Sequence, residues 1–303
     1  MIRTAKFGIW LFTLALLLSL TGCGNRVSDS NLANGDLTDP AFLEVNEAMQ
    51  ESGESSQDAV FEGFDAAFDY LFGSSLMSAS IADTIIYIYT YEGEWHHLII
   101  DYLDDTTGNT YYLDDSVRIR DTLGYAQQFP DTNNIGSIEV KVKRYVYIAA
   151  YDTSQDFQFK GDDTVIAAAN FVINYVDSTA TFNGLANEWA KGTFMHPDSA
   201  VECSLDVALL HIVNDLVIPI DTGDCPISGR VSASGNVNIM CPFATDTVRV
   251  SGSWTRIINI GQNSVTIICQ NNTTKWVLII PKSQFCDNSP VVAFDRIPGR
   301  FQN

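Results

Sequence analysis

Basic residues are scarce in this chain of 303 residues, with 17 Lys and Arg against 37 Asp and Glu and a formal net charge of −20. Proteins that bind nucleic acids neutralise phosphates with clustered Lys and Arg, and the sequence contains no such cluster. This shortage argues against a nucleic-acid partner. Hydrophobic residues make up 46% of the chain, which is enough to form one large domain or two ordinary ones.

Signatures of catalysis and metal binding are also missing. The sequence has no Gly-x-Ser-x-Gly, no Ser-x-x-Lys and no Cys-x-x-Cys pattern. His96 and His97 are adjacent on an expected strand, so their side chains point to opposite faces and cannot bind one metal ion together. His196 and His211 are isolated. We therefore expect no metal and no cofactor. The sequence favours a non-catalytic protein and leaves an enzyme without a sequence signature open.

The first residues have the pattern of a secretory leader. Arg3 and Lys6 give a positive start, and the Leu-rich segment Phe7–Leu20 carries no charge. That segment is shorter than the roughly 20 residues that a membrane-spanning helix needs. The segment Leu20-Thr21-Gly22-Cys23 follows, with a branched apolar residue and two small residues before a cysteine.

This segment resembles the lipobox of bacterial lipoproteins. The resemblance implies that residues 1–22 form a signal peptide and that Cys23 carries a diacylglycerol and an acyl chain such as palmitate. The partner of the anchor would be a membrane of a bacterial cell envelope. Gly24 stands where Asp retains lipoproteins at the inner membrane of enteric bacteria, which favours the outer membrane, facing the periplasm or the surface. We expect residues 23–38 to be a lipidated, flexible tether.

The cysteines beyond the anchor all lie in the last third of the chain. An exported protein meets an oxidising compartment, so disulfides are expected. The number is odd, so at most two bridges can form, and the sequence does not select the pairing among Cys203, Cys225, Cys241, Cys269 and Cys286. Alternation along strands places Cys203, Cys241 and Cys269 on a core-facing side, whereas Cys225 and Cys286 lie in segments typical of turns.

Two short N-terminal helices are expected before the strands. Asp39-Pro40 is typical of a helix start, and Gly53 of a helix end. A second helix is expected to begin at Ser55, where Ser55 and Asp58 form a capping-box pattern, and to end at Gly73.

From about Ile85 the hydrophobic period changes to two. Ten or so segments rich in β-branched and aromatic residues, separated by turns, predict a mainly β fold: a large antiparallel meander that forms a sandwich or a partly open barrel. We expect one β-rich globular region over residues 39–303. A split near residues 187–198 is the alternative, because residues 187–192 interrupt the strand pattern and all five of these cysteines lie beyond them. Four tryptophans are expected in the core: Trp95, Trp189, Trp254 and Trp276.

Three functional hypotheses remain open. The first is a membrane-anchored envelope lipoprotein that acts as a non-catalytic binding or structural module. The second is a lipid or lipoprotein carrier that resembles the half-open β-barrels of the lipoprotein-localisation system, with helices across an apolar cavity. The third is a hydrolase whose site has no sequence signature. The sequence names no small-molecule or protein partner.

Overall fold

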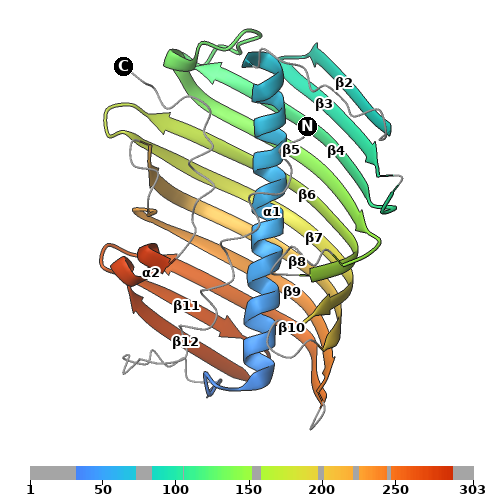
Figure 1. Ribbon diagram of the computed structural model, residues 1–303. Coiled ribbons are helices and arrows are strands. Elements are labelled where there is room, and N and C mark those ends of the chain that lie inside the picture. Colours follow the sequence, from blue (N-terminus) through green and yellow to red (C-terminus); the bar gives the residue numbers. More distant parts are fainter. Residues whose placement is uncertain are drawn as a thin grey trace.

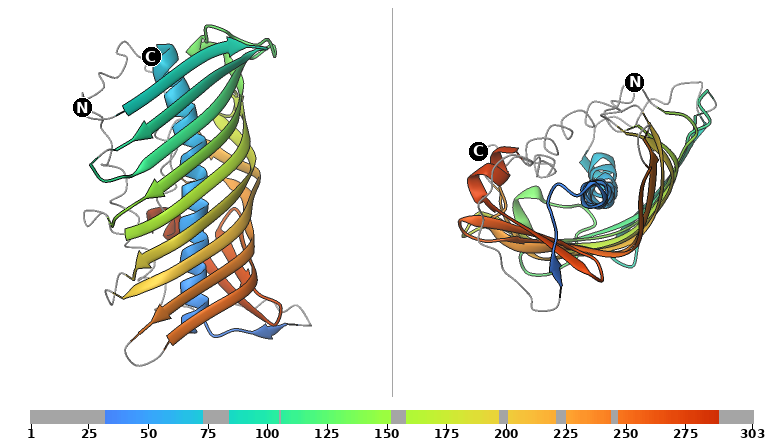
Figure 2. Two further views of the ribbon diagram at one scale, coloured as in Figure 1. Left: turned by 90° about the vertical axis from the view of Figure 1, so that its right-hand side faces the viewer. Right: turned by 90° about the horizontal axis from the view of Figure 1, so that it is seen from below.

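The computed structural model describes residues 32–72, 84–104, 106–151, 158–196, 201–220, 225–243 and 247–288. These residues form one curved sheet with a long helix lying along its concave side (Figure 1). The view from below shows the helix inside the curve of the sheet, which opens on one side (Figure 2). The elements are α1 (Pro40–Phe72) and α2 (Lys282–Asn288), and the strands β1 (Ala33–Asn34), β2 (Thr84–Glu92), β3 (Trp95–Leu103), β4 (Thr110–Asp121), β5 (Ile135–Ile148), β6 (Gln158–Asn174), β7 (Thr179–Met195), β8 (Glu202–Pro219), β9 (Ser228–Pro242), β10 (Thr247–Ile260), β11 (Ser264–Gln270) and β12 (Thr274–Pro281).

The sheet has 12 strands in the order β1-β12-β11-β10-β9-β8-β7-β6-β5-β4-β3-β2. From β2 to β12 each strand pairs antiparallel with the next along the chain. The predicted mainly β class and antiparallel meander are confirmed. Strands β1 and β2 lie at opposite ends of the order, so the described strands leave the sheet open.

The chain before α1 is attached to the sheet. Strand β1 pairs parallel to β12, with Ala33 opposite Thr274 and Asn34 opposite Lys275. The indole Nε1 of Trp276 donates a hydrogen bond to the carbonyl oxygen of Asp36 at 2.9 Å. The prediction of a flexible tether up to residue 38 is therefore wrong for its last part. A polar sequence without aromatics still offers backbone groups, and an open sheet edge binds them.

The two expected N-terminal helices are one continuous helix. Helix α1 runs from Pro40 to Phe72 and passes through Gly53, where we expected an end. Glycine within a helix costs about 1 kcal/mol relative to alanine, which packing against the sheet can offset. The second helix of the structure is α2, at the other end of the chain and next to β11 and β12.

The long strands β6 and β7 pair closely in the middle of the sheet. Residues 187–192, which the sequence pattern marks as an interruption, lie inside β7 and pair with both β6 and β8. Gly161 and Gly192 face each other across β6 and β7, and a Cβ added to Gly192 would lie 2.1 Å from the carbonyl oxygen of Lys160. Glycine lets the two backbones approach this closely.

Candidate functional site

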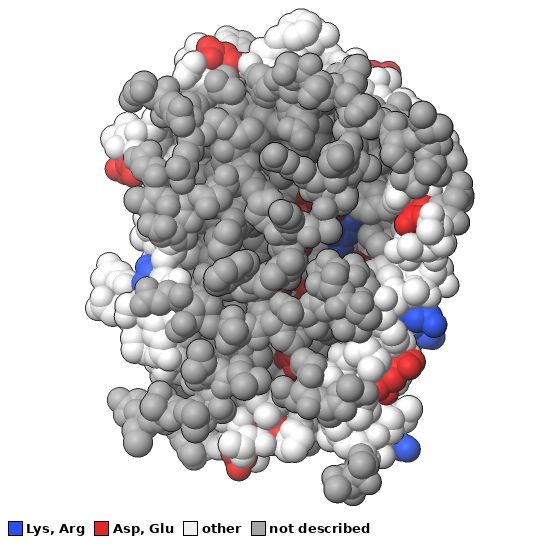
Figure 3. Space-filling view, viewed as in Figure 1, with Lys and Arg blue, Asp and Glu red and all other residues white. Residues whose placement is uncertain are grey.

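A row of ionisable side chains crosses the concave face beneath α1. Six strands each contribute one of them, so that the row follows the helix across the sheet. We call this row the polar seam; it consists of Asp115 on β4, Arg144 on β5, Asp163 on β6, Glu188 on β7, His211 on β8 and Arg256 on β10. In the view from the helix side, acidic and basic side chains are visible together near the middle of this face (Figure 3).

The centre of the polar seam is a buried group of two serines, an acid and a histidine. Ser56 donates a hydrogen bond to Glu188 Oε2 at 2.6 Å, and Ser52 Oγ lies 2.9 Å from His211 Nε2. Glu188 Oε2 is 3.6 Å from the same Nε2. Burial raises the pKa of Glu188 to about 8 and lowers the pKa of His211 to about 4, so both are mainly uncharged near neutral pH.

This group does not have the geometry of a catalytic triad. In a triad the serine and the acid contact different nitrogens of the histidine ring, whereas here both contact Nε2 of His211. Ser52 and Ser56 are also buried, at 5% and 4% exposure, beneath α1. The arrangement can hold α1 to the sheet through hydrogen bonds.

An ionic group lies beside this centre. Arg144 donates to Asp163 Oδ2 at 2.8 Å and to Glu62 Oε2 at 3.4 Å. Ser55 of α1 donates to the same Asp163 oxygen at 2.7 Å, and Tyr111 donates to Glu62 at 3.2 Å. Because Arg144 is buried, its pairing with two carboxylates offsets part of the desolvation penalty.

Asp115 lies at the β4 end of the polar seam with no exposed surface. Neither of its carboxyl oxygens has a hydrogen-bond partner in the described part of the chain. A Cβ added to Gly63 of α1 would lie 2.6 Å from Asp115 Oδ1, so glycine is what allows α1 to pass over this side chain. Burial raises the pKa of Asp115 to about 8, which keeps the group mainly protonated at neutral pH.

The polar seam separates two apolar clusters on the concave side. One contains Phe61 of α1 with Phe171 and Phe182, and the other contains Phe42 and Met49 of α1. Phe42 stacks on Trp276 with ring centroids 5.2 Å apart. Helix α1 therefore contacts apolar side chains at both ends of its described part and hydrogen-bonding groups in between.

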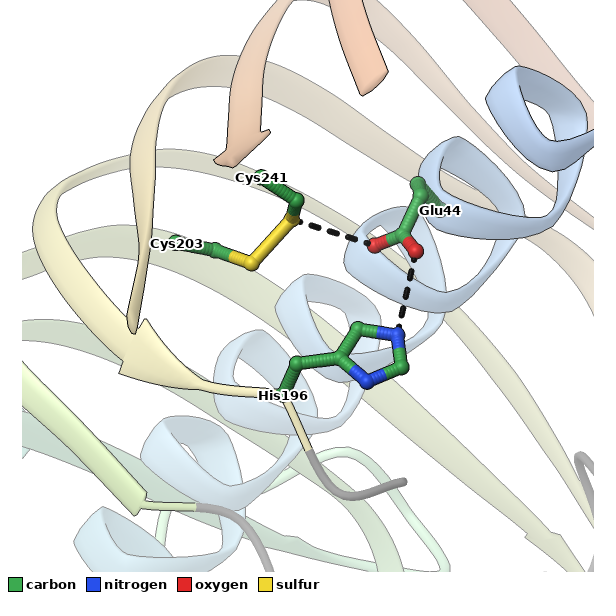
Figure 4. The surroundings of a disulfide bond; sticks show 4 residues. All are labelled: Glu44, His196, Cys203 and Cys241. Atoms are coloured by element: carbon green, nitrogen blue, oxygen red, sulfur yellow. Dashed lines mark hydrogen bonds and ion pairs between the residues drawn. A yellow bond between two sulfur atoms is a disulfide. The ribbon is translucent and has the colours of Figure 1, made fainter. Parts of the chain in front are cut away.

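A disulfide lies at the beginning of α1 (Figure 4). Cys203 on β8 and Cys241 on β9 are bonded, with Cα atoms 4.4 Å apart. Glu44 of α1 points at this bond, with Oε2 3.7 Å from Cys241 Sγ, and Oε1 lies 3.2 Å from His196 Nε2. The contact positions the start of α1 over strands β8 and β9.

The other cysteines are placed as follows. Cys225 bonds to Cys286, which joins the chain before β9 to α2. Cys269 is free and buried, and burial raises the pKa of its thiol to about 11. The predicted core-facing side of Cys203, Cys241 and Cys269 is confirmed, because all three are buried. Cys23 lies outside the described residues.

The four histidines do not come together. His96 is buried between Tyr89 Oη at 2.8 Å and the carbonyl oxygen of Gln127 at 3.0 Å, whereas His97 lies 2.8 Å from Ser116 Oγ on the opposite face of the sheet. No cluster of metal-ligating side chains is found among the described residues.

Trp254 and Trp276 are buried as expected, but Trp189 is 46% exposed, so its predicted place in the core is wrong. Its partners in the alternation, Glu188 and Ala190, take the inward side instead.

Sequence reasoning missed the polar seam. Its members sit at inward positions of strands whose neighbours on that face are apolar, such as Leu113 and Val117 around Asp115. The available signal was a charged residue that interrupts an apolar alternation, once in each of several strands. Such an interruption indicates that the charged side chain meets a polar partner on the element packed against that face, here α1.

Comparison of the chain with protein-family models, with curated proteins and with solved structures finds no match. In the described part of the chain, no helix has the length and apolar character needed to cross a membrane.

Proposed function

We propose that this protein is a lipid-anchored lipoprotein of a bacterial envelope whose curved domain is a non-catalytic binding or structural module. The observation that carries the second half of this proposal is the polar seam. Acid–base or nucleophilic chemistry would best suit Ser52, Glu188 and His211. These side chains are buried beneath α1, where His211 makes close polar contacts with both Ser52 and Glu188. They support the fold by connecting helix and sheet.

The anchor half of the proposal rests on the lipobox pattern at Cys23. The experiment is mass spectrometry of the N-terminal peptide from protein purified from bacterial membranes. We expect a peptide that begins at Cys23 and carries a diacylglycerol and an acyl chain. Cys23→Ser removes the modification and leaves the signal peptide uncleaved at this position. An unmodified Cys23 in membrane-purified protein contradicts the anchor.

A second candidate function is that of a lipid or lipoprotein carrier. It is favoured by the open, curved sheet with a helix on its concave side (Figure 2) and by inward aliphatic side chains beside α1 that are only partly buried. These are Val213 on β8, Ile258 on β10, Ile267 on β11 and Leu278 on β12. A bound acyl chain would lie against such a surface.

Native mass spectrometry of the purified protein tests the carrier function. We expect an added mass that disappears on denaturation and that extracts as lipid, distinct from the covalent mass at Cys23. Replacing Ile258 and Ile267 by Asn lowers the occupancy of this lipid. A protein that shows only its covalent mass after expression in the presence of native lipids contradicts the carrier and leaves the module proposal in place.

A further inference from the structure

Large apolar side chains are exposed on the convex side of the sheet, opposite α1. The exposed fractions are 43% for Ile166, 50% for Leu185, 46% for Trp189 and 36% for Leu210. They lie on β6, β7 and β8, in the middle of the sheet. We call these four residues the convex band. Patches of this kind on a soluble surface mark contacts with a partner or a membrane.

The strand register makes the convex band continuous. Ile166 pairs with Asn187, which pairs with Leu210. On one side of this row, Leu185 lies between Ala168 and Ile212, and on the other side Trp189 lies between Thr164 and Ala208. A hollow of about 470 Å³ borders the convex band, lined by Trp95, Lys141, Leu185, Leu210 and Ile212 among others. The small side chains between the large ones leave this surface open.

Charges of both signs border the convex band. Lys143 pairs with Ile166 and Lys141 with Ala168, and both lysines are exposed. On the β9 side the same rows end in Ser232, Ser234 and Asn236. These rows hold no carboxylate from β5 to β9. In the next row beyond Trp189, however, Lys191 lies between Asp162 and Asp206, and Asp114 on β4 pairs with Lys143.

We infer that the convex band is a second membrane contact, which lies on the headgroup region of the bilayer that holds the lipid anchor. Tryptophan and aliphatic side chains are the composition that favours this region. The inference rests on the proposed anchor at Cys23 for the position of the domain.

The length of chain before the sheet agrees with this orientation. Residues 24–31 lie between Cys23 and the first described residue, and eight residues reach at most about 28 Å when extended. The chain enters the sheet at its edge strand β1, which pairs with β12. Strand β8 is five strands from β1, or about 24 Å. The tether is therefore long enough for the bilayer that holds Cys23 to meet the β8 side of the convex band.

The experiment uses the full acylated protein in vesicles of phosphatidylethanolamine and phosphatidylglycerol whose acyl chains carry bromine. Bromine quenches tryptophan fluorescence only at short range, so it reports which tryptophan enters the bilayer. We expect strong quenching of the wild type and loss of most of it in Trp189→Phe. Leu185→Asn with Leu210→Asn keeps Trp189 but lowers its quenching, whereas the control Ile88→Asn, at an equally exposed position on β2, leaves it unchanged.

Equal quenching of wild type and Trp189→Phe overturns the inference. So does protection of Trp189 that depends on protein concentration in detergent, because a second copy of the chain then covers the convex band. Flotation of the vesicles tests the anchor separately: protein that fails to float lacks the acyl group. In that case the quenching is measured on protein added to the same vesicles, where loss in Trp189→Phe still supports the convex band.

Discussion

Buried carboxyl groups are the residue-scale feature that most affects the behaviour of this protein. Asp115 and Glu188 are almost fully buried, and burial raises the pKa of each to about 8. The folded state therefore holds protons that the unfolded state releases between about pH 4 and pH 8. A folded state that binds more protons loses stability as the pH rises through this range, and its stability is then constant above it with respect to these groups.

Asp115→Asn isolates one of these contributions. The amide does not titrate, so the fall in the free energy of unfolding between pH 4 and pH 8 becomes smaller than in the wild type. Each unit of pKa shift corresponds to about 1.4 kcal/mol, so the difference amounts to several kcal/mol. Urea unfolding across this pH range measures it. Asp114→Asn, one residue away on the outward face, is the matched control, and parallel curves for wild type and Asp115→Asn contradict the prediction.

The cysteine pairing gives a second residue-scale prediction. The native protein does not react with iodoacetamide at neutral pH, because the Cys269 thiol is buried and its pKa is raised to about 11. After unfolding without reduction, one label is expected, at Cys269. Peptide mapping should then recover Cys203 with Cys241 and Cys225 with Cys286. A label at Cys225 or Cys286 contradicts the pairing.

At the scale of elements, the continuity of α1 depends on its close contact with the sheet. The sequence favours a helix end at Gly53, yet the chain stays helical there because Ser52 and Ser56 bond to His211 and Glu188. Small residues on this face of α1 allow the polar seam to fit beneath it. A helix break inferred from one glycine was outweighed by contacts with strands more than a hundred residues away.

Two glycines of α1 test this contact. Gly63→Ala is expected to destabilise the protein by roughly 1–3 kcal/mol, because the new methyl group meets Asp115. Gly53→Ala, whose Cβ would be 3.8 Å from the nearest atom, Nδ1 of His211, is expected to stabilise it by about 0.5–1 kcal/mol through helix propensity. Thermal unfolding compares the two variants. Equal stabilisation by both would show that α1 does not approach β4 at Gly63.

At the scale of the whole molecule, one sheet connects the ends of the described chain. Trp95 on β3 and Trp276 on β12 report on opposite parts of the sheet. With a continuous sheet and a single helix across it, we expect one cooperative unfolding transition with the same midpoint for both tryptophans. Variants that each retain one of these tryptophans, unfolded in urea and followed by fluorescence, measure the two midpoints. Separate midpoints would favour a domain split between them.

The sequence was informative where a single period or a local turn decides the structure. Glycine marks the turn between β2 and β3, where Gly93 and Glu94 have positive φ values of 56° and 73°, as a two-residue hairpin turn requires. Val140 and Val142 face inward and Lys141 faces outward, as alternation predicts. For the candidate site, alternation shows only that a polar residue interrupts an apolar face, as Asp115 does on β4. It does not show that Asp115, Glu188 and His211 meet α1, because that contact joins distant parts of the chain.

The sequence by itself determined the elements of this protein: strands of period two, a helical N-terminal segment, an odd set of cysteines and the leader pattern that predicts lipidation of Cys23. These depend on residues near one another in the chain, so local physical rules apply to them. Only the tertiary structure decided which cysteines pair, that α1 is continuous, and that a polar seam lies inside while Trp189 lies outside. Those outcomes depend on which distant strands contact the helix. That arrangement determines which side chains are buried, and burial in turn determines their hydrogen bonds and protonation states.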